Sequence, residues 1–328
     1  AGGSLWLLGR LAEPSPRLFT ILWILILGIG LVDISFVNRK YLRFYDAEAG
    51  LQKDALTSFL SESQTREPSR YKLASRGPYL NHFLNNLTPV YRLQTFDVPA
   101  ARSFPADLET YMALENGNSL RFFDLLNVRH FLSEAPFNLF GLLPKYQVPN
   151  PYEQGKSVFI YENDGAVPRA RLVHRATVET NTDGVFATLN SKLFQPKSET
   201  LLVSDRPFLK ELSGSLQVAG DSVEMVKYRD HEVRIKTASK EGGILVLADH
   251  FDPEWEALVD GKISPIFRAD YLMRGIQLPA GVHEVVFRVK RDFLYNTLPM
   301  LFLGLFLICL ILFLVRKPRP VEAFSEPG

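Results

Sequence analysis

The sequence predicts an α+β fold in which two transmembrane helices flank a large middle region. Three observations predict it. Apolar runs lie near both ends of the chain, the middle region begins with apolar residues at helical spacing, and its second half consists of short alternating segments separated by turns. The middle region is therefore expected to combine an irregular α/β part, residues 38–150, with a jelly-roll-like β-sandwich, residues 151–292.

The apolar run at residues 293–315 predicts the second transmembrane helix. Its 23 residues carry no charge, and at a rise of about 1.5 Å per residue they would cross a hydrocarbon core about 30 Å thick. Arg291 precedes the run and Arg316–Lys317 follow it, as residues that anchor a helix at the membrane interface do. Residues 316–328 would then form a short tail.

The run at residues 18–37 predicts the first transmembrane helix. A cleaved signal peptide would also be apolar, but "NRKYLRFYD" follows the run in place of a small-residue cleavage pattern. Residues 1–17 form an N-terminal flank. The "SLWLL" within that flank is typical of the end of a truncated preceding helix, so the chain is expected to be part of a longer protein.

Charged residues at the end of the first run have two interpretations. Asp33 lies within the run, where an ionisable side chain indicates a functional site, but it also lies close enough to the end to reach the headgroup zone. Arg39, Lys40 and Arg43 follow. They could bind a lipid phosphate or act as ordinary interface anchors, and both interpretations remain open.

The first part of the middle region predicts helices and short strands in alternation. Apolar residues between positions 51 and 60 recur at helical spacing. "SRYKLAS" predicts a strand, and "ADLETYMAL" and "SLRFFDLLNV" predict helices. "VRHFLS" predicts a strand that leaves the second of these helices.

The second part, after the turn-rich "YQVPNPYEQG", predicts many short strands. In "HEVRIKTA", Val233, Ile235 and Thr237 alternate with polar residues, which predicts one buried face. "GGILVLAD" is apolar on both faces, as a central strand is, and Asp260-Gly261 predicts a two-residue hairpin turn. The other predicted strands are SVFIYE, RARLVHRATVE, GVFATLN, TLLVSD, SVEMVKYR, EALVD, ISPIFRA and EVVFRV.

Composition excludes several kinds of site. A net charge of +1 without a basic stripe gives no electrostatic basis for a nucleic-acid partner. The only cysteine, Cys309, lies in the second apolar run, so the middle region has no disulfide, thiolate nucleophile or cysteine metal site. The six histidines lack zinc-ligand spacing, and GxSxG, P-loop and Rossmann patterns do not occur. We therefore predict no catalytic, cofactor-binding or metal-ligating residue in this chain.

The segment "ADHFDPEW", residues 248–255, concentrates acidic and aromatic residues. As a binding site it would contact a sugar or a cation, with Trp255, Phe251 and Tyr271 as the aromatic platform for a glycan. As a structural element it would be a strand-ending turn whose acidic residues cap backbone groups while Trp255 packs into the sandwich. Turns routinely collect Asp and Pro, which favours the structural interpretation.

Three segments carry a resemblance to a known family. They are "LLNVRHFL" (125–132), "VFIYENDGAVPRARLV" (158–173) and "DPEWEALVDGKISPIFRADYLMRGIQLPAGVHEVVFRV" (252–289). In this order, followed by an apolar run, they resemble the C-terminal region of bacterial YfhO-like membrane proteins, which are related to GT-C glycosyltransferases. The family's usual "PGW" stands here as Pro253-Glu254-Trp255, which alters the turn but keeps the tryptophan.

The resemblance implies a location and a function. It implies a multi-pass protein of the bacterial plasma membrane, with the middle region extracytoplasmic and residues 316–328 cytoplasmic. The parent protein would use a polyprenyl-phosphate-linked sugar to modify a cell-envelope glycopolymer. Its catalytic part would lie in N-terminal helices of the same parent, so this chain alone would be inactive and hold no cofactor. The alternative is a non-catalytic two-span envelope module that binds a glycan or acts as a scaffold.

Overall fold

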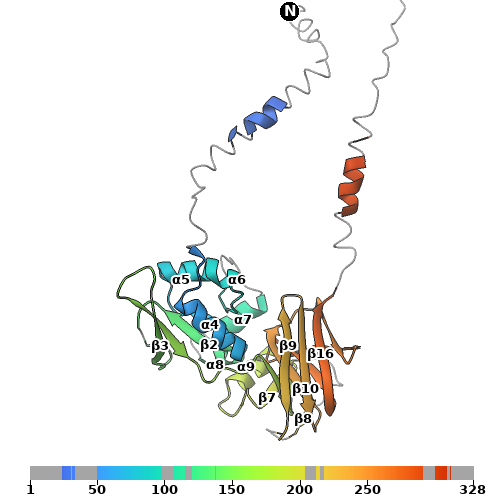
Figure 1. Ribbon diagram of the computed structural model, residues 1–328. Coiled ribbons are helices and arrows are strands. Elements are labelled where there is room, and N and C mark those ends of the chain that lie inside the picture. The colour runs from blue at the N-terminus through green and yellow to red at the C-terminus, as the bar shows by residue number, and fades with distance from the viewer. Residues whose placement is uncertain are drawn as a thin grey trace, which may run out of the picture. The chain divides into compact units, whose positions relative to one another are not determined.

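The computed structural model describes residues 24–30, 32–33, 50–97, 106–114, 120–136, 138–203, 212–214, 218–290, 300–308 and 311. The chain divides into two compact units, Ala1–Asp54 and Ala55–Gly328. The second unit contains three β-sheets and several short helices (Figure 1). The described part of this unit is therefore an α+β structure rich in strands.

The first sheet has four strands in the order β1-β2-β4-β3. Strands β1 and β2 run parallel, whereas β4 pairs antiparallel with both β2 and β3. The strands are β1 (Arg70–Leu73), β2 (Val128–Ser133), β3 (Pro144–Pro149) and β4 (Ser157–Glu162). The helices of this part are α4 (Ala55–Arg66), α5 (Pro78–His82), the π-helix η1 (Phe83–Leu87), α6 (Thr88–Val90), α7 (Ala106–Leu114) and α8 (Leu120–Leu125).

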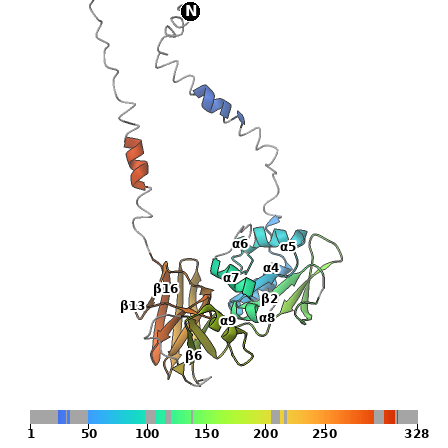
Figure 2. The same ribbon diagram turned by 180° about the vertical axis from the view of Figure 1, so that it is seen from behind.

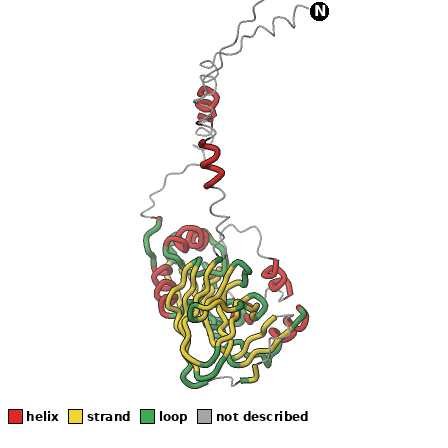
Figure 3. Tube along the Cα trace, turned by 90° about the vertical axis from the view of Figure 1, so that its right-hand side faces the viewer, coloured by secondary structure: helices red, strands yellow, loops and turns green. Residues whose placement is uncertain are grey.

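The other two sheets pack face to face (Figures 2 and 3). One has seven strands in the order β5-β11-β15-β14-β7-β6-β8, and the other has five in the order β13-β12-β16-β10-β9. The elements are β5 (Ala170–Val173), β6 (Arg175–Glu179), α9 (Thr182–Asn190), β7 (Glu199–Val203), β8 (Leu212–Ser213), β9 (Ser222–Arg229), β10 (Glu232–Ser239), β11 (Gly243–His250), β12 (Trp255–Val259), β13 (Lys262–Ser264), β14 (Phe267–Ala269), β15 (Met273–Leu278) and β16 (Gly281–Val289).

Strand β11 contributes to two hydrophobic cores because its alternate residues point to opposite faces of the sheet. Leu245 and Leu247 pack between the two large sheets. Ile244, Val246 and Ala248 belong to the core that includes residues of α7, α8 and α9. Since β11 lies between β5 and β15, the prediction of a central strand is confirmed.

The predicted hairpin at Asp260-Gly261 is also confirmed. These two residues join β12 to β13 and have φ angles of 50° and 79°. Positive φ at both central positions is the requirement of a type I′ turn, which Asp-Gly satisfies at little steric cost.

The prediction of two transmembrane helices is wrong. Within residues 18–37 the structure describes 24–30 and 32–33 as helical, and within residues 293–315 it describes 300–308 and 311. Among the described residues no helix is long and apolar enough to cross a membrane, so the predicted multi-pass membrane location is corrected as well. The rest of both runs and the two predicted tails lie outside the described residues.

The predicted jelly roll is wrong because the seven-stranded sheet is mixed. "GVFATLN", predicted as a strand, lies in α9, where the Asn181 side chain caps the helix by accepting a hydrogen bond from the Gly184 N–H at 2.7 Å. Helix α9 connects β6 to β7, and these strands pair in parallel, whereas a jelly roll is antiparallel. The predicted domain boundary at residues 150/151 falls between β3 and β4, which pair with each other in the first sheet.

A buried ion-pair network joins the first sheet to the seven-stranded sheet. Asp249 of β11 lies 2.9 Å from an Arg70 guanidinium nitrogen of β1 and 2.7 Å from one of Arg169. Arg70 also donates to the carbonyl oxygens of Leu126 and Ala248, each at 2.8 Å. These contacts fix the first sheet, which carries the pocket described below, against the sandwich.

Candidate functional site

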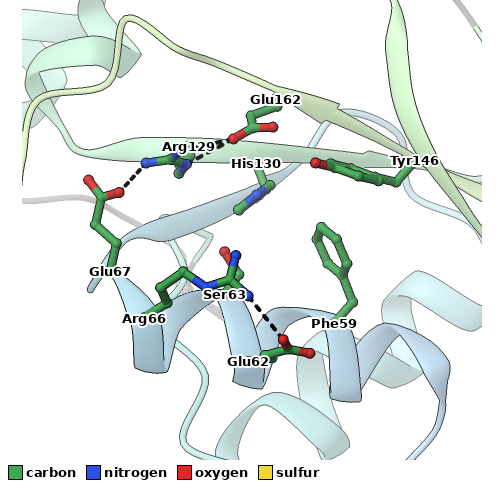
Figure 4. Close-up of a pocket in the computed structure, with 9 residues that line it drawn as sticks. All are labelled: Phe59, Glu62, Ser63, Arg66, Glu67, Arg129, His130, Tyr146 and Glu162. Atoms are coloured by element: carbon green, nitrogen blue, oxygen red, sulfur yellow. Dashed lines mark hydrogen bonds and ion pairs between the residues drawn. The ribbon is translucent and has the colours of Figure 1, made fainter.

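A cavity of about 240 Å³ lies between helix α4 and the first sheet (Figure 4). Its residues come from one helix and three strands. They are Phe59, Glu62, Ser63, Arg66, Glu67, Arg129, His130, Tyr146 and Glu162. We name this cavity the α4 pocket.

Helix α4 and Glu67, which follows it, supply one wall because the lining residues recur at helical spacing. Positions 59, 62, 63, 66 and 67 differ by three or four residues, which places them along one side of the helix and its end. The neighbouring stripe, Leu56, Thr57 and Leu60, is buried and holds the helix in place. Arg66 and Glu62 form an exposed ion pair at 3.0 Å, which contributes little to stability.

Strand register brings the residues of the opposite wall to one face of the sheet. His130 on β2 pairs directly with Glu162 on β4. Tyr146 on β3 pairs with Ile160, two residues before Glu162, and therefore points to the same side. The three side chains belong to three adjacent strands and are held by main-chain pairing rather than by loops.

Charged groups in the α4 pocket are arranged in pairs. Arg129 contacts both Glu67 and Glu162, and Lys145 lies 2.5 Å from Glu162. Burial raises the pKa of the Glu162 carboxyl, but the hydrogen bonds and positive charges of Lys145 and Arg129 outweigh it, so the pKa lies below its usual value. Glu162 is therefore a carboxylate at neutral pH, a hydrogen-bond acceptor and not a general acid.

Aromatic rings form the apolar part of the α4 pocket. The Phe59 ring lies 5.1 Å from that of Tyr146, tilted by 51°, and 5.4 Å from the His130 ring in an edge-to-face arrangement. Tyr146 is 40% exposed, so part of its surface remains open to a ligand.

His130 is the most deeply buried polar residue of the α4 pocket, at 2% exposure. Burial lowers the pKa of its imidazole to about 4, with only a partial opposing effect from Glu162. Within the described part of the chain its Nδ1 has no hydrogen-bond partner. The ring is therefore neutral at physiological pH and has an unused polar atom.

The low pKa of His130 predicts a loss of stability in mild acid. Because the folded-state pKa of about 4 lies below the unfolded value of about 6.5, the unfolded state binds the proton first as the pH falls. Between pH 6.5 and pH 4 the free energy of unfolding of wild type should fall by about 3 kcal/mol more than that of His130→Phe. Urea unfolding of both proteins across this range measures the difference. Parallel pH profiles would contradict the assignment of a neutral, buried imidazole.

The structure places the three aromatic residues predicted to bind a glycan at two positions. Arg268 lies over the rings of Phe251 and Tyr271, at 4.9 Å and 6.0 Å from their centroids. Trp255 is half-buried, with the Arg274 guanidinium 3.7 Å from its ring centroid. Protein groups thus already contact all three rings, and glycan binding through them stays a prediction.

Tyr271 also packs against neighbouring aromatic residues. Its ring stacks on that of Tyr111 at 5.8 Å, and the Phe186 ring lies 4.9 Å away. In the same region Asp252 accepts a hydrogen bond from the Glu254 N–H at 2.7 Å, as expected of an acidic residue that caps a turn.

The remaining predicted residues belong to the first apolar run. Asp33 is exposed in the helical segment 32–33. Arg39, Lys40 and Arg43 lie outside the described residues.

Sequence reasoning missed the α4 pocket because its residues come from four separate segments. The available signal was the polar pair Arg129-His130 within the otherwise apolar "VRHFL". A polar pair within a buried strand indicates partners on a neighbouring element, but the sequence does not identify them.

Comparison of the chain with family models, curated proteins and solved structures finds no match. In the described parts of the chain, no group of three or more His, Cys, Asp or Glu side chains could hold a metal ion. The geometry and charge of the α4 pocket are therefore the basis for inferring a function.

Proposed function

We propose that this protein binds a carbohydrate in the α4 pocket and performs no chemistry on it there. The observation that carries the proposal is the combination of partly open aromatic rings with fixed, paired charged groups in one cavity. An aromatic face packs against the C–H face of a sugar ring, and charged groups form strong hydrogen bonds with its hydroxyls.

The charge balance of the α4 pocket favours an uncharged sugar. Glu62, Glu67 and Glu162 are matched by Arg66, Arg129 and by Lys145, which pairs with Glu162. His130 adds no charge at neutral pH, because burial lowers its pKa to about 4. An ionic ligand would find no free charge of opposite sign, because these groups already pair with one another.

The size of the α4 pocket limits how much of a glycan it holds. Its 240 Å³ corresponds to about eight water molecules, which is room for about one sugar unit. A longer chain would have one unit in the pocket and the others along the surface. The pre-formed charge pairs and strand-held side chains reduce the ordering cost of binding.

The proposal keeps one part of what the YfhO-like resemblance implies, the carbohydrate class of the ligand. The polyprenyl-phosphate-linked sugar donor, the envelope glycopolymer acceptor and the N-terminal helices of a parent protein rest on that resemblance alone. Of the two functions that the sequence suggests, the α4 pocket supports the non-catalytic, glycan-binding one.

A glycan array followed by titration calorimetry tests the proposal. Wild type is expected to bind at least one neutral oligosaccharide, and Tyr146→Ala should weaken that binding at least tenfold, which is about 1.4 kcal/mol. Phe251→Ala is the matched control, since it truncates an aromatic residue of the other candidate site. Thermal unfolding of both variants verifies their folding.

Two results would contradict the proposal. One is normal binding by Tyr146→Ala together with loss of binding by Phe251→Ala, which would assign the glycan to the segment around Trp255. The other is the absence of any glycan ligand on the array, which would leave the scaffold function.

A further inference from the structure

A second cavity, of about 590 Å³, lies between the segment that follows α6 and the turn that joins β9 to β10. Its residues are Thr88, Pro89, Arg92, Leu93, Gln94, Thr95, Tyr228, Arg229, Asp230 and His231. It shares no residue with the α4 pocket. We name it the β9–β10 groove.

Cationic side chains outnumber acidic ones in the β9–β10 groove. The cations are Arg92 and Arg229, both exposed, and Asp230 is the one carboxylate among the lining residues. Among the residues that the structure describes, neither Arg92 nor Arg229 forms an ion pair. Two guanidinium groups with free donors therefore face one groove, whereas charges in the α4 pocket are paired.

The segment that carries Arg92 is held in an uncommon conformation. Arg92 has a φ of 53°, in the left-handed region that costs a non-glycine residue energy. Main-chain contacts fix it there, because the Leu93 N–H donates to the Thr88 carbonyl at 2.9 Å. The Gln64 side chain both accepts from the Gln94 N–H and donates to its carbonyl, each at 2.8 Å. Arg92 is thus displayed by a rigid segment.

A buried excess of positive charge lies behind the groove. Tyr228 lines the groove, and its hydroxyl contacts Asp249 at 3.1 Å and also Arg169. Arg70 and Arg169 pair with Asp249, and the positive charge of Arg274 also acts on this carboxylate. Three buried cations around one anion make the potential on the Tyr228 side positive.

We propose that the β9–β10 groove binds a phosphate group. Arginine presents a planar fork of donors that matches a phosphate with two parallel hydrogen bonds. Arg92 and Arg229 would contact the oxyanion from the two sides of the groove, and His231 would add a donor. The chemistry fits a small free anion or an anionic group on a chain. This inference does not depend on the proposed carbohydrate site.

Titration calorimetry at low salt tests the proposal with two probes, inorganic pyrophosphate and long-chain polyphosphate. Arg92→Gln/Arg229→Gln should weaken binding of the preferred probe at least tenfold and reduce the salt dependence of its affinity. Lys192→Gln/Lys240→Gln removes the same charge from exposed positions outside the groove and should bind like wild type. Tighter binding of polyphosphate than of pyrophosphate, per phosphate group, would identify a chain-borne anion, and equal binding a small one.

The proposal is overturned if neither probe binds wild type. It is also overturned if the two double variants lose affinity equally, since binding would then follow net charge and not the groove. Both double variants change exposed side chains only, and their melting temperatures verify that any loss of binding is local.

Discussion

Asp249→Asn is expected to lower the free energy of unfolding by about 3–5 kcal/mol, the range found when one partner of a buried ion pair is removed. Asp249 is the carboxylate that Arg70 and Arg169 share, and it lies close to Arg274. Asparagine keeps the shape of the side chain but not its charge. The buried guanidinium groups would then repel one another without compensation.

Urea unfolding at neutral pH measures this effect, with Tyr228→Phe as the control. Tyr228→Phe removes one hydroxyl from the same network. It should lower the free energy of unfolding by only about 1 kcal/mol, a typical value for one hydrogen bond. A loss below 1 kcal/mol for Asp249→Asn would contradict the structural role of the network.

The effect of Asp249→Asn should depend on pH. Burial raises the pKa of the Asp249 carboxyl, but the charges of Arg169, Arg70 and Arg274 outweigh burial and lower it. A lowered folded-state pKa gives stability that is present above the unfolded value of about 3.9 and is lost as the pH falls through the folded value. The difference between wild type and variant should therefore shrink only in strong acid.

Asp270→Asn is expected to lower the free energy of unfolding by a similar amount, about 3–5 kcal/mol. Asp270 is 1% exposed, follows β14 and contacts strands β5 and β7. It pairs with Arg171 of β5 and accepts hydrogen bonds from the Thr200 hydroxyl at 2.8 Å and the Leu201 N–H at 3.0 Å. Asparagine tolerates the φ of 45° at this position, so the loss would come from the unpaired Arg171 and not from the backbone.

Asp252→Asn is the matched control for this second prediction. Asp252 lies in a more exposed turn, and an asparagine side chain there can still accept the hydrogen bond from Glu254. Its effect should stay within about 0.5 kcal/mol, as for most surface substitutions. Equal losses for Asp270→Asn and Asp252→Asn would show that the Arg171–Asp270 pair contributes nothing specific.

Local signals in the sequence were sufficient for several elements of the fold. The two apolar faces of "GGILVLAD" predicted a central strand, and Asp260-Gly261 predicted a tight hairpin, because both depend on neighbouring residues alone. Helix α9 was missed because "GVFATLN" is short and apolar, and such a segment suits a strand or a helix. The signal that distinguishes them is Asn181, whose side chain caps the helix.

The α4 pocket could not be predicted for a different reason. Phe59 and Glu162 are more than a hundred positions apart, and only the parallel pairing of β1 with β2 and the register of β4 bring the two walls together. The predicted platform of Trp255, Phe251 and Tyr271 relied on residue type. Sequence could not show that Arg268 and Arg274 cover these rings.

Hydrogen–deuterium exchange with a bound oligosaccharide tests the central claim, carbohydrate binding in the α4 pocket, most directly. With the best glycan from the array, peptides from α4 (residues 55–66), β2 and β3 should exchange more slowly, and those from residues 248–272 should be unchanged. Protection confined to residues 248–272, with none in α4, β2 or β3, would contradict the claim and assign the glycan to the aromatic residues around Trp255.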